Sequence, residues 1–508
     1  MSTTIHTAPP ANATPEERQS VLATLKRPRW LKTEVLAGLL VALALIPEAI
    51  AFSLIAGVDP QVGLFAAATM AMSIAFLGGR PAMISAATAA TALVIAPLMA
   101  SHGLDYLLVA VILAGVFQVI LGVLGVGKLM RFIPRSVMVG FVNALGILIF
   151  TSQLPDLIGV PWLVYPLTAA GLAIIYLLPR ITTVVPAPLI SIIVVTALAL
   201  AFALNVPTVG DKGQLPDALP TLSLPDVPFT LETFQIVAPY SLGMALVGLL
   251  ESLMMAKLVD DITDTRSNKV RESWGQGAAN IISGFFGGMG GCAMVGQTMI
   301  NVKASGARTR ISTFLAGVLV LVLAVSLGEV VALIPMAALV AVMIFVSIAT
   351  FDWHSVRPST LKMMPMSETI VMVVTVIATV ATHNLAVGVG LGVLTAMVLF
   401  ARRVAHFATV TRTVKGEGEQ AVARYTVDGE LFWASSNDLY TQFEYAEDPQ
   451  RIVIDLTTSH LWDASTIAAL DSVEDKYRHY GKNVEVIGLN EASQNMRKRM
   501  SGRLDAGH

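Results

Sequence analysis

Long apolar runs separated by short polar stretches dominate the chain as far as residue 403. A helix needs about 20 apolar residues to cross the hydrocarbon layer of a bilayer. Eleven runs approach this length, and three shorter runs rich in small residues lie among them. We therefore predict fourteen membrane segments: 34–52, 62–78, 83–99, 104–124, 136–152, 163–178, 188–205, 236–258, 275–287, 292–302, 310–328, 331–348, 367–383 and 385–401.

The hydrophobic pattern changes near residue 409, where short apolar runs replace the long ones. Such runs predict strands, and Asp428-Gly429 between two of them predicts a hairpin turn. About 100 residues suffice for one small α/β domain. The predicted strands are 422–427, 430–433, 451–456 and 484–488, and the predicted helices are 435–446, 464–479 and 491–499.

Charge divides the chain at the same place. Residues 1–403 hold 41 of the 68 Asp, Glu, Lys and Arg residues, about a tenth of that part, and residues 404–508 hold the other 27, about a quarter. Soluble proteins average about 25%. We therefore predict a cytoplasmic N-terminal segment at 1–32, a transmembrane domain at 33–403 and a soluble domain at 409–508.

Three further features limit the possible classes. A net charge of −2 gives no reason to expect a nucleic-acid partner. The single cysteine, Cys292, excludes an intramolecular disulfide framework. We also expect no cleavable secretory signal, because residues 1–30 are polar and the first apolar run is too long.

Positive charge predicts the orientation, because cytoplasmic loops collect Lys and Arg. With the N-terminus inside and fourteen alternating segments, 21 of the 22 Lys and Arg residues before residue 404 fall on the inner side. The remaining one is Lys212 in a Pro-rich loop. We therefore expect both termini in the cytoplasm.

Two of the short segments follow glycine-containing breaks, Gly-Gly-Arg-Pro at 78–81 and Gly-Gly-Met-Gly-Gly at 287–291. Each segment is the third in its own run of seven, and paired interruptions of this kind point to the central site of a transporter. Because seven is an odd number, the second half enters the membrane from the opposite side. The pattern therefore predicts an inverted repeat of seven plus seven segments.

A helix that begins inside the membrane has unpaired N–H groups and about half a positive charge at that end. Two such ends facing each other make an anion site without a basic side chain. Small residues let a ligand approach the backbone, and Thr88 and Gln297 offer side-chain donors. Close helix packing is the simpler explanation of the small residues. The predicted anion-binding residues of these segments are Ala86, Ala87, Thr88, Ala293, Met294, Gly296 and Gln297.

Two carboxylates fall well inside predicted segments, Glu48 in the first and Glu251 in the eighth. An ionised acid at mid-depth costs about 3 kcal/mol, so each is expected to have a function. The repeat makes these segments equivalent and places both acids near one centre. We predict that a proton on Glu251, shared with Glu48, accompanies the anion; the alternative is a neutral acid bonded to nearby backbone. Phe52 shares a helix face with Glu48 and is expected to form an apolar wall.

Motifs along most of the chain resemble those of the SulP sulfate-permease family of anion transporters, and the tail resembles a STAS domain. The motifs of the membrane part are Ala37-Gly38-Leu39, Ile46-Pro47-Glu48-Ala49-Ile50-Ala51-Phe52, Ala56-Gly57-Val58-Asp59-Pro60, and Asn301 with Gly306-Ala307-Arg308-Thr309. Those of the tail are Asp455-Leu456 and Asp463-Ala464-Ser465.

The resemblance implies core and gate bundles, a homodimer, an elevator-like movement of the core, and an anion bound between the third and tenth segments. Carried over by position, the family's pocket glutamine falls on Glu48, its aromatic residue on Phe52 and its eighth-segment acid on Glu251. Two pairs of residues depart from the family, in addition to Glu48 itself. The Ser-Arg pair of many animal members is Gly296-Gln297 here, and the Gly-Pro of the third segment is Ala86-Ala87.

These departures leave bicarbonate, another monoanion and proton-coupled sulfate open, because an arginine is lost and the acidic Glu48 is gained. Sodium coupling is less expected, since Met255 stands where sodium-coupled members have Thr. In related STAS regulators a phosphorylatable Ser follows the Asp, whereas here that residue is Ala464, which leaves only Ser465 as a candidate.

We favour a secondary anion transporter of the plasma (inner) membrane. The alternatives are a nucleobase or dicarboxylate:proton symporter with the same architecture, which would fit the intramembrane carboxylates, and an anion channel. A membrane enzyme is the least expected class, because no metal or nucleophile cluster lies within the segments, and we expect no cofactor.

Overall fold

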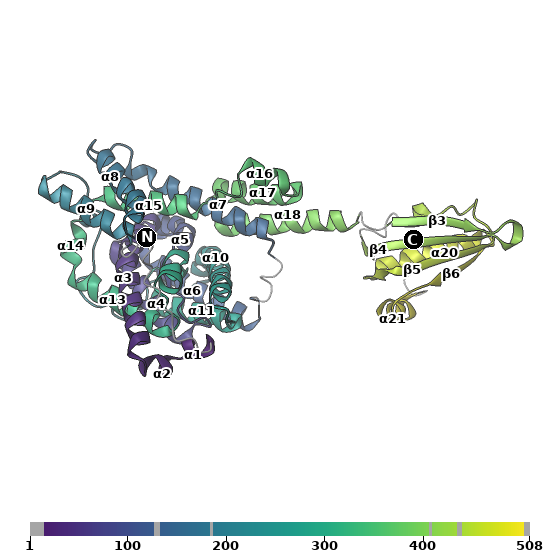
Figure 1. The fold of residues 1–508 in the computed structure, drawn as a ribbon, viewed down its shortest axis with the longest axis horizontal. Helices are drawn as coiled ribbons and strands as arrows, with labels where there is room; N and C mark the ends of the chain where they lie inside the picture. Colours follow the sequence, from purple (N-terminus) through teal and green to yellow (C-terminus); the bar gives the residue numbers. More distant parts are fainter. Residues whose placement is uncertain are drawn as a thin grey trace. The chain divides into compact units, whose positions relative to one another are not determined.

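The computed structural model describes residues 15–125, 127, 133–182, 186–405, 409–433 and 439–501. Residues 1–14 of the predicted N-terminal segment and two of the basic residues counted above, Lys128 and Arg131, lie outside the described residues. The chain forms two compact units, Met1–Val393 and Leu394–His508. The first is helical around a large apolar core, and the second has a sheet and a separate core (Figure 1).

A helix covers most of every predicted apolar segment except the two interrupted ones, which begin with extended backbone and are helical only in part. Proline and glycine mark several ends: Pro28 opens α3, and Gly57 closes it in the left-handed conformation with φ 76°. These helices are α3 (Pro28–Ala56), α4 (Pro60–Leu77), α6 (Leu104–Val123), α7 (Arg135–Ser152), α8 (Val164–Leu177), α9 (Ala187–Ala201), α10 (Leu231–Thr263), α11 (Lys269–Phe285), α13 (Arg310–Ser326), α15 (Met336–Thr350), α17 (Met366–Thr382) and α18 (Leu385–Ala405).

Six helices of the described residues are long and apolar enough to cross a membrane, and six further apolar helices are shorter. Short helical turns connect them: α1 (Pro15–Gln19), α2 (Val21–Leu25), η2 (Leu154–Asp156), η3 (Leu178–Arg180), η4 (Val209–Asp211), α14 (Gly328–Ala332) and α16 (Pro358–Met363). One predicted segment was too short. The segment at 275–287 covers only the later part of α11. The first turns of this helix carry polar residues such as Lys269 and Glu272, so the apolar pattern did not include them.

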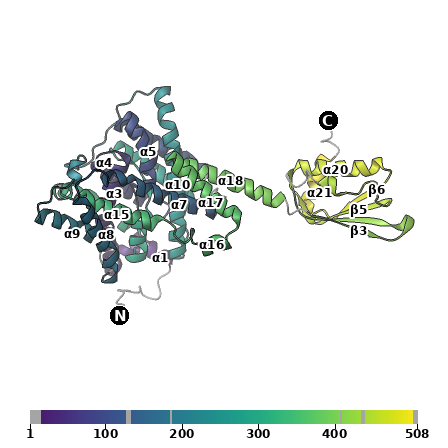
Figure 2. The same ribbon diagram turned by 90° about the horizontal axis from the view of Figure 1, so that it is seen from above.

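Helix contacts confirm the seven-plus-seven repeat. The fourth segment of each half packs on the second of the other half, as α6 on α11 and α13 on α4. The first segment of each half also packs on the fourth of the other half, as α10 on α6 and α3 on α13. The sixth segment of each half packs on the fifth of the other half, as α17 on α7 and α8 on α15. Figure 2 shows the last of these pairs from above, with α17 beside α7 and α15 beside α8. Segments one to four of each half therefore form a core bundle, and the remaining segments form a gate bundle.

The two interrupted segments are not helical from the positions that we predicted, 83 and 292. Each begins with extended backbone, as β1 (Ser85–Ala86) and β2 (Cys292–Ala293). Helix α5 (Ala89–His102) follows β1. After β2 come α12 (Val295–Met299) and a π-helical turn (Ile300–Ala304). These stretches are extended because β1 of the first half and β2 of the second half pair with each other.

The second unit is a four-stranded sheet with strand order β3-β4-β5-β6, formed by β3 (Thr409–Lys415), β4 (Val422–Leu431), β5 (Arg451–Leu461) and β6 (Asn483–Ile487). The strands β3 and β4 are antiparallel, and the others pair in parallel. The helices α20 (Ala464–His479) and α21 (Glu491–Met500) confirm two of the predicted helices.

Two predictions for this unit were wrong. Asp428-Gly429 is not a hairpin turn, because β4 runs through it with a register irregularity between Thr426 and Asp428. The hairpin instead joins β3 and β4 around η6 (Gly418–Gln420). The predicted helix 435–446 is a 3-10 turn, η7 (Leu439–Gln442), followed by non-helical chain, and residues 434–438 lie outside the described residues.

Candidate functional site

The two glycine-containing breaks meet at the centre of the helical unit. Ser85 pairs with Ala293 and Ala86 with Cys292 in antiparallel register. The Met294 N–H extends the pairing by donating to the Ile84 carbonyl at 2.9 Å. The contact is so close that a Cβ on Gly291 would lie 1.8 Å from the Ala86 carbonyl oxygen. The two halves are therefore joined by backbone at this point, and Gly291 permits it.

Two helical starts lie directly after these strands. Thr88 caps α5, and its hydroxyl oxygen accepts from the Thr91 N–H at 3.3 Å. The helical stretch that begins at Val295 has no side-chain cap, because its N-cap residue is Met294. Unpaired N–H groups at a helix start favour a negative group nearby. The backbone thus concentrates positive potential where the two halves meet.

The predicted residues differ in their access to open space. Ala86, Ala87 and Ala293 are fully buried, so they form the floor of the site and not its accessible wall. Gly296 is exposed, and a Cβ on it would meet no atom within 4 Å. Its neighbour Val295 is 50% exposed. Of the small residues that we predicted, Gly296 is therefore the one that borders open space.

Gln297 is the least satisfied polar side chain near the site. It is fully buried, and neither its amide oxygen nor its amide nitrogen makes a hydrogen bond of ordinary geometry among the described residues. The Glu48 carboxyl of α3 lies beside it. Glu48 is only half-buried. A buried amide without a good hydrogen bond costs free energy. Its position beside a carboxyl and near the exposed Gly296 is typical of a ligand-binding site.

The second acid belongs to a buried polar chain. Glu251 of α10 accepts from the Cys292 thiol, with 2.9 Å between Oε2 and Sγ. The same sulfur lies 3.2 Å from the Thr88 hydroxyl. Phe52 is buried in the apolar core. The fold thus brings Glu48 and Gln297 together, and separately joins Glu251 to the start of α5.

The sequence pattern missed the polar residues that hold the breaks in place. The Glu272 carboxylate accepts from the N–H groups of Gly79 and Arg80 at 2.7 and 2.9 Å. The Asn280 side chain donates to and accepts from Gly291 at 3.0 and 2.8 Å. The signal that could have identified them is the spacing of four residues between Glu272, Gln276 and Asn280, which places them on one face of α11.

The polar residue Asn301 holds the first break from the other half. Its amide nitrogen donates to the Ala82 carbonyl at 2.8 Å and to the Ser312 hydroxyl at 3.0 Å. Buried polar groups of this kind cost free energy unless they are paired. Each break is therefore fixed by a buried amide, Asn301 for the first and Asn280 for the second.

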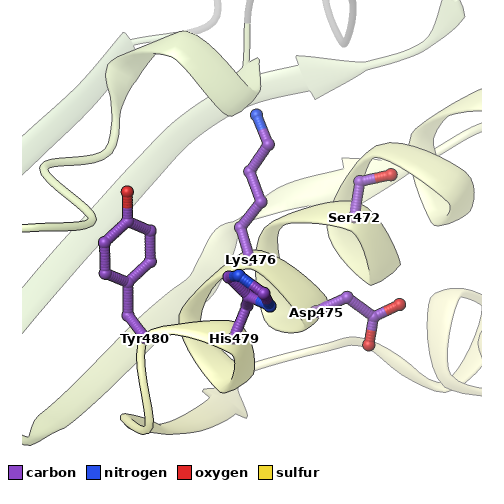
Figure 3. Close-up of a pocket in the computed structure, with 5 residues that line it drawn as sticks. All are labelled: Ser472, Asp475, Lys476, His479 and Tyr480. Atoms are coloured by element: carbon purple, nitrogen blue, oxygen red, sulfur yellow. The ribbon is translucent and has the colours of Figure 1, made fainter.

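Two cavities lie elsewhere. Figure 3 shows an open depression of about 340 Å³ on α20, lined by Ser472, Asp475, Lys476, His479 and Tyr480. Its charged groups are already engaged, Lys476 by the rings of Tyr440 and Tyr445 and Asp475 by Arg478. A smaller cleft of about 30 Å³ lies where a core helix meets a gate helix, between Ala51 and Leu54 of α3 and Leu339 of α15.

Comparison with known proteins identifies the family. Residues 31–169 and 162–375 match the Sulfate permease family, and residues 415–500 match the STAS domain. The chain is 52% identical over 481 residues to the "Putative sulfate transporter YbaR" of Bacillus subtilis (strain 168), covering 94% of this chain and 99% of that protein.

More distant relatives agree. The Bicarbonate transporter BicA of Picosynechococcus sp. is 26% identical over 505 residues, covering 88% of this chain and 87% of BicA. The solved structure of the murine Slc26a9 anion transporter in the inward-facing state has the same fold, with a TM-score of 0.80 at 17% identity, covering 97% of this chain and 91% of that one. The chain therefore belongs to the sulfate permease family of membrane transporters and carries a C-terminal STAS domain.

Proposed function

We propose that this protein is a proton-linked secondary transporter of a small inorganic oxyanion of the sulfate or bicarbonate class. The anion binds between the start of α5 and the helical stretch that begins at Val295. The observation that carries this proposal is the buried Gln297 carboxamide, which makes no hydrogen bond of ordinary geometry among the described residues and whose interaction is with the Glu48 carboxyl beside it. Relatives named as sulfate and bicarbonate transporters support the anion class.

The charge of the site explains why a proton takes part. Positive potential comes from the backbone ends of two helices, each equivalent to about half an elementary charge. An ionised Glu48 beside Gln297 would cancel much of it. A doubly charged anion therefore binds when Glu48 is protonated, whereas a monoanion also tolerates the ionised acid. Glu251 is the second candidate carrier of the proton, because it is buried and bonded to the strand pair.

Transport requires the site to reach both sides of the membrane. The core bundle carries Glu48, Glu251 and both strands, while the gate bundle contributes none of the groups described above. An elevator movement of the core against the gate is therefore the simplest cycle, and the cleft between α3 and α15 lies on the sliding surface. We place the protein in the plasma (inner) membrane as a homodimer with both termini in the cytoplasm.

The test uses purified protein in liposomes with labelled sulfate or bicarbonate and an imposed proton gradient. We expect saturable uptake of one of these anions, accelerated when the outside is acidic. Glu251→Gln should lose this acceleration, because an amide cannot exchange a proton. Glu329→Gln, at an exposed position of α14, is the matched control and should behave like the wild type.

Three results would contradict the proposal. Uptake of uracil or a dicarboxylate in place of inorganic anions would indicate a different substrate class. Large unitary currents would indicate a channel. Unchanged gradient dependence in Glu251→Gln would remove the proton role from this acid.

A further inference from the structure

We propose that Cys292 is a hydrogen-bond relay that transmits the protonation state of Glu251 to the Thr88 hydroxyl at the start of α5. The inference rests on the proposed function, since it states how the proton and the anion are coupled. Cys292 is here a positioning residue, because it acts on the anion through Thr88.

The three side chains form one continuous chain across the two halves of the repeat. Glu251 comes from α10, Cys292 from β2 and Thr88 from the turn before α5. The contacts are 2.9 Å from Oε2 to Sγ and 3.2 Å from Sγ to Oγ1. All three side chains are at least nine-tenths buried. Water is therefore a poor competitor for these bonds.

The direction of the bonds depends on one proton. When Glu251 is ionised, the thiol donates to the carboxylate and the Thr88 hydroxyl donates to the sulfur. When Glu251 is protonated, its O–H donates to the sulfur and the thiol donates to the Thr88 oxygen. Thr88 already accepts from the Thr91 N–H, so its own hydroxyl hydrogen then turns away from the sulfur and can donate to the Thr91 hydroxyl oxygen, 3.1 Å away, or to an anion. No bond to hydrogen breaks in Cys292 or Thr88, because only the orientation of each hydrogen changes.

Among the described residues around these three hydrogen-bonded side chains, Glu251 is the group whose charge can change the direction of the bonds. The elements α5, α6, α11 and β2 pack on α10. The groups that they bring to this region are neutral: Thr91 from α5, Gln118 from α6 and Asn280 from α11. Glu272 of α11 is bonded to Gly79, Arg80 and Gln276 instead. Glu48 lies beside Gln297, and among the described residues Cys292 is the titratable group that touches Glu251.

The first experiment needs no transport. Cys292 is the one cysteine of the chain, so the S–H stretching band in the infrared spectrum of the purified protein has a single source. A thiol that donates to a carboxylate is more strongly bonded than one that donates to a hydroxyl. We expect the band to move to higher frequency as the pH falls from neutral to acidic. In Glu251→Gln it should stay fixed.

Thr88→Val sharpens this test. Without the hydroxyl oxygen, a thiol that accepts from protonated Glu251 loses its acceptor at Thr88, so the band at acidic pH should move further, toward the position of an unbonded thiol. A wild-type band that stays constant with pH, or that moves equally in Glu251→Gln, would overturn the relay.

The second experiment compares proton-driven uptake in two variants. Cys292→Ser keeps a donor and acceptor in place, and should keep the acceleration by an inward proton gradient. Cys292→Ala removes the link between Glu251 and Thr88. The acceleration should then shrink about fivefold, which corresponds to the net free energy of one ordinary hydrogen bond. An alanine variant with wild-type acceleration contradicts the relay. If the wild type moves no inorganic anion, the proposed function fails, and the infrared result still decides on the relay.

Discussion

Gln297 shows how a single side chain can carry functional information. A buried amide without a hydrogen bond of ordinary geometry costs free energy, and in the proposed function an oxyanion would lower that cost by accepting from its N–H groups. Sequence inspection could single out Gln297, Glu48 and Glu251 because polar residues stand out in an apolar segment. It could not find the roles of Cys292, Glu272 or Asn280, since their partners lie far away along the chain.

Replacing Gln297 by Leu tests this reading at the residue scale. The leucine should raise the KM for the transported anion about tenfold, because a hydrogen bond to a charged group contributes about 1.5–3 kcal/mol. The anion-free protein should unfold at the same or a higher temperature, since an unpaired polar group is removed. Concentration-dependent uptake in liposomes and thermal unfolding in detergent measure the two effects. An unchanged KM would remove Gln297 from the site.

At the scale of elements, the strong periodic segments were predictable and the shortest elements were not. Helices such as α6 and α20 follow from long patterns in the sequence. The strands β1 and β2 have two residues each, which is too few for an alternating pattern. The turn signal at Asp428-Gly429 failed because β4 pairs with β5 on both sides of it, so tertiary pairing outweighs local preference.

Gly291→Ala tests the strand pair. Its methyl carbon would lie 1.8 Å from the Ala86 carbonyl oxygen, so the two strands would have to separate. We expect a destabilisation of about 1–3 kcal/mol, seen as a lower unfolding temperature, together with loss of uptake. Gly390→Ala in α18 is the control, because its Cβ meets no atom within 4 Å. Equal behaviour of both variants would show that the close contact is unimportant.

On the scale of the whole molecule, the division into core and gate follows from which helices exchange partners. The odd number of segments in each half predicted the inverted repeat, which is a property of chain topology, whereas the division into core and gate was expected from the family resemblance. The sequence could not predict the packing surface between the bundles, because small apolar residues line many helix faces. The cleft between α3 and α15 identifies that surface.

Cross-linking across this cleft tests the movement of the core. With Cys292 replaced by Ser, cysteines are introduced at Ala51 of α3 and Leu339 of α15, which line the same cleft. A short bifunctional thiol reagent should abolish uptake in the double variant, because it ties the core to the gate. Each single-cysteine variant treated in the same way should retain uptake. Full transport by the cross-linked protein would exclude a sliding core.

The pairing of β1 with β2 also has a consequence for synthesis. Ser85 and Ala86 are made more than 200 residues before Cys292 and Ala293, yet their backbone groups are paired only with that later stretch. In lipid, unpaired backbone groups are expensive. The nascent first half must therefore keep this stretch sheltered, by the insertion machinery or in a provisional position, until the ribosome has delivered its counterpart. The strand pair can thus form only after the chain has been made past residue 293.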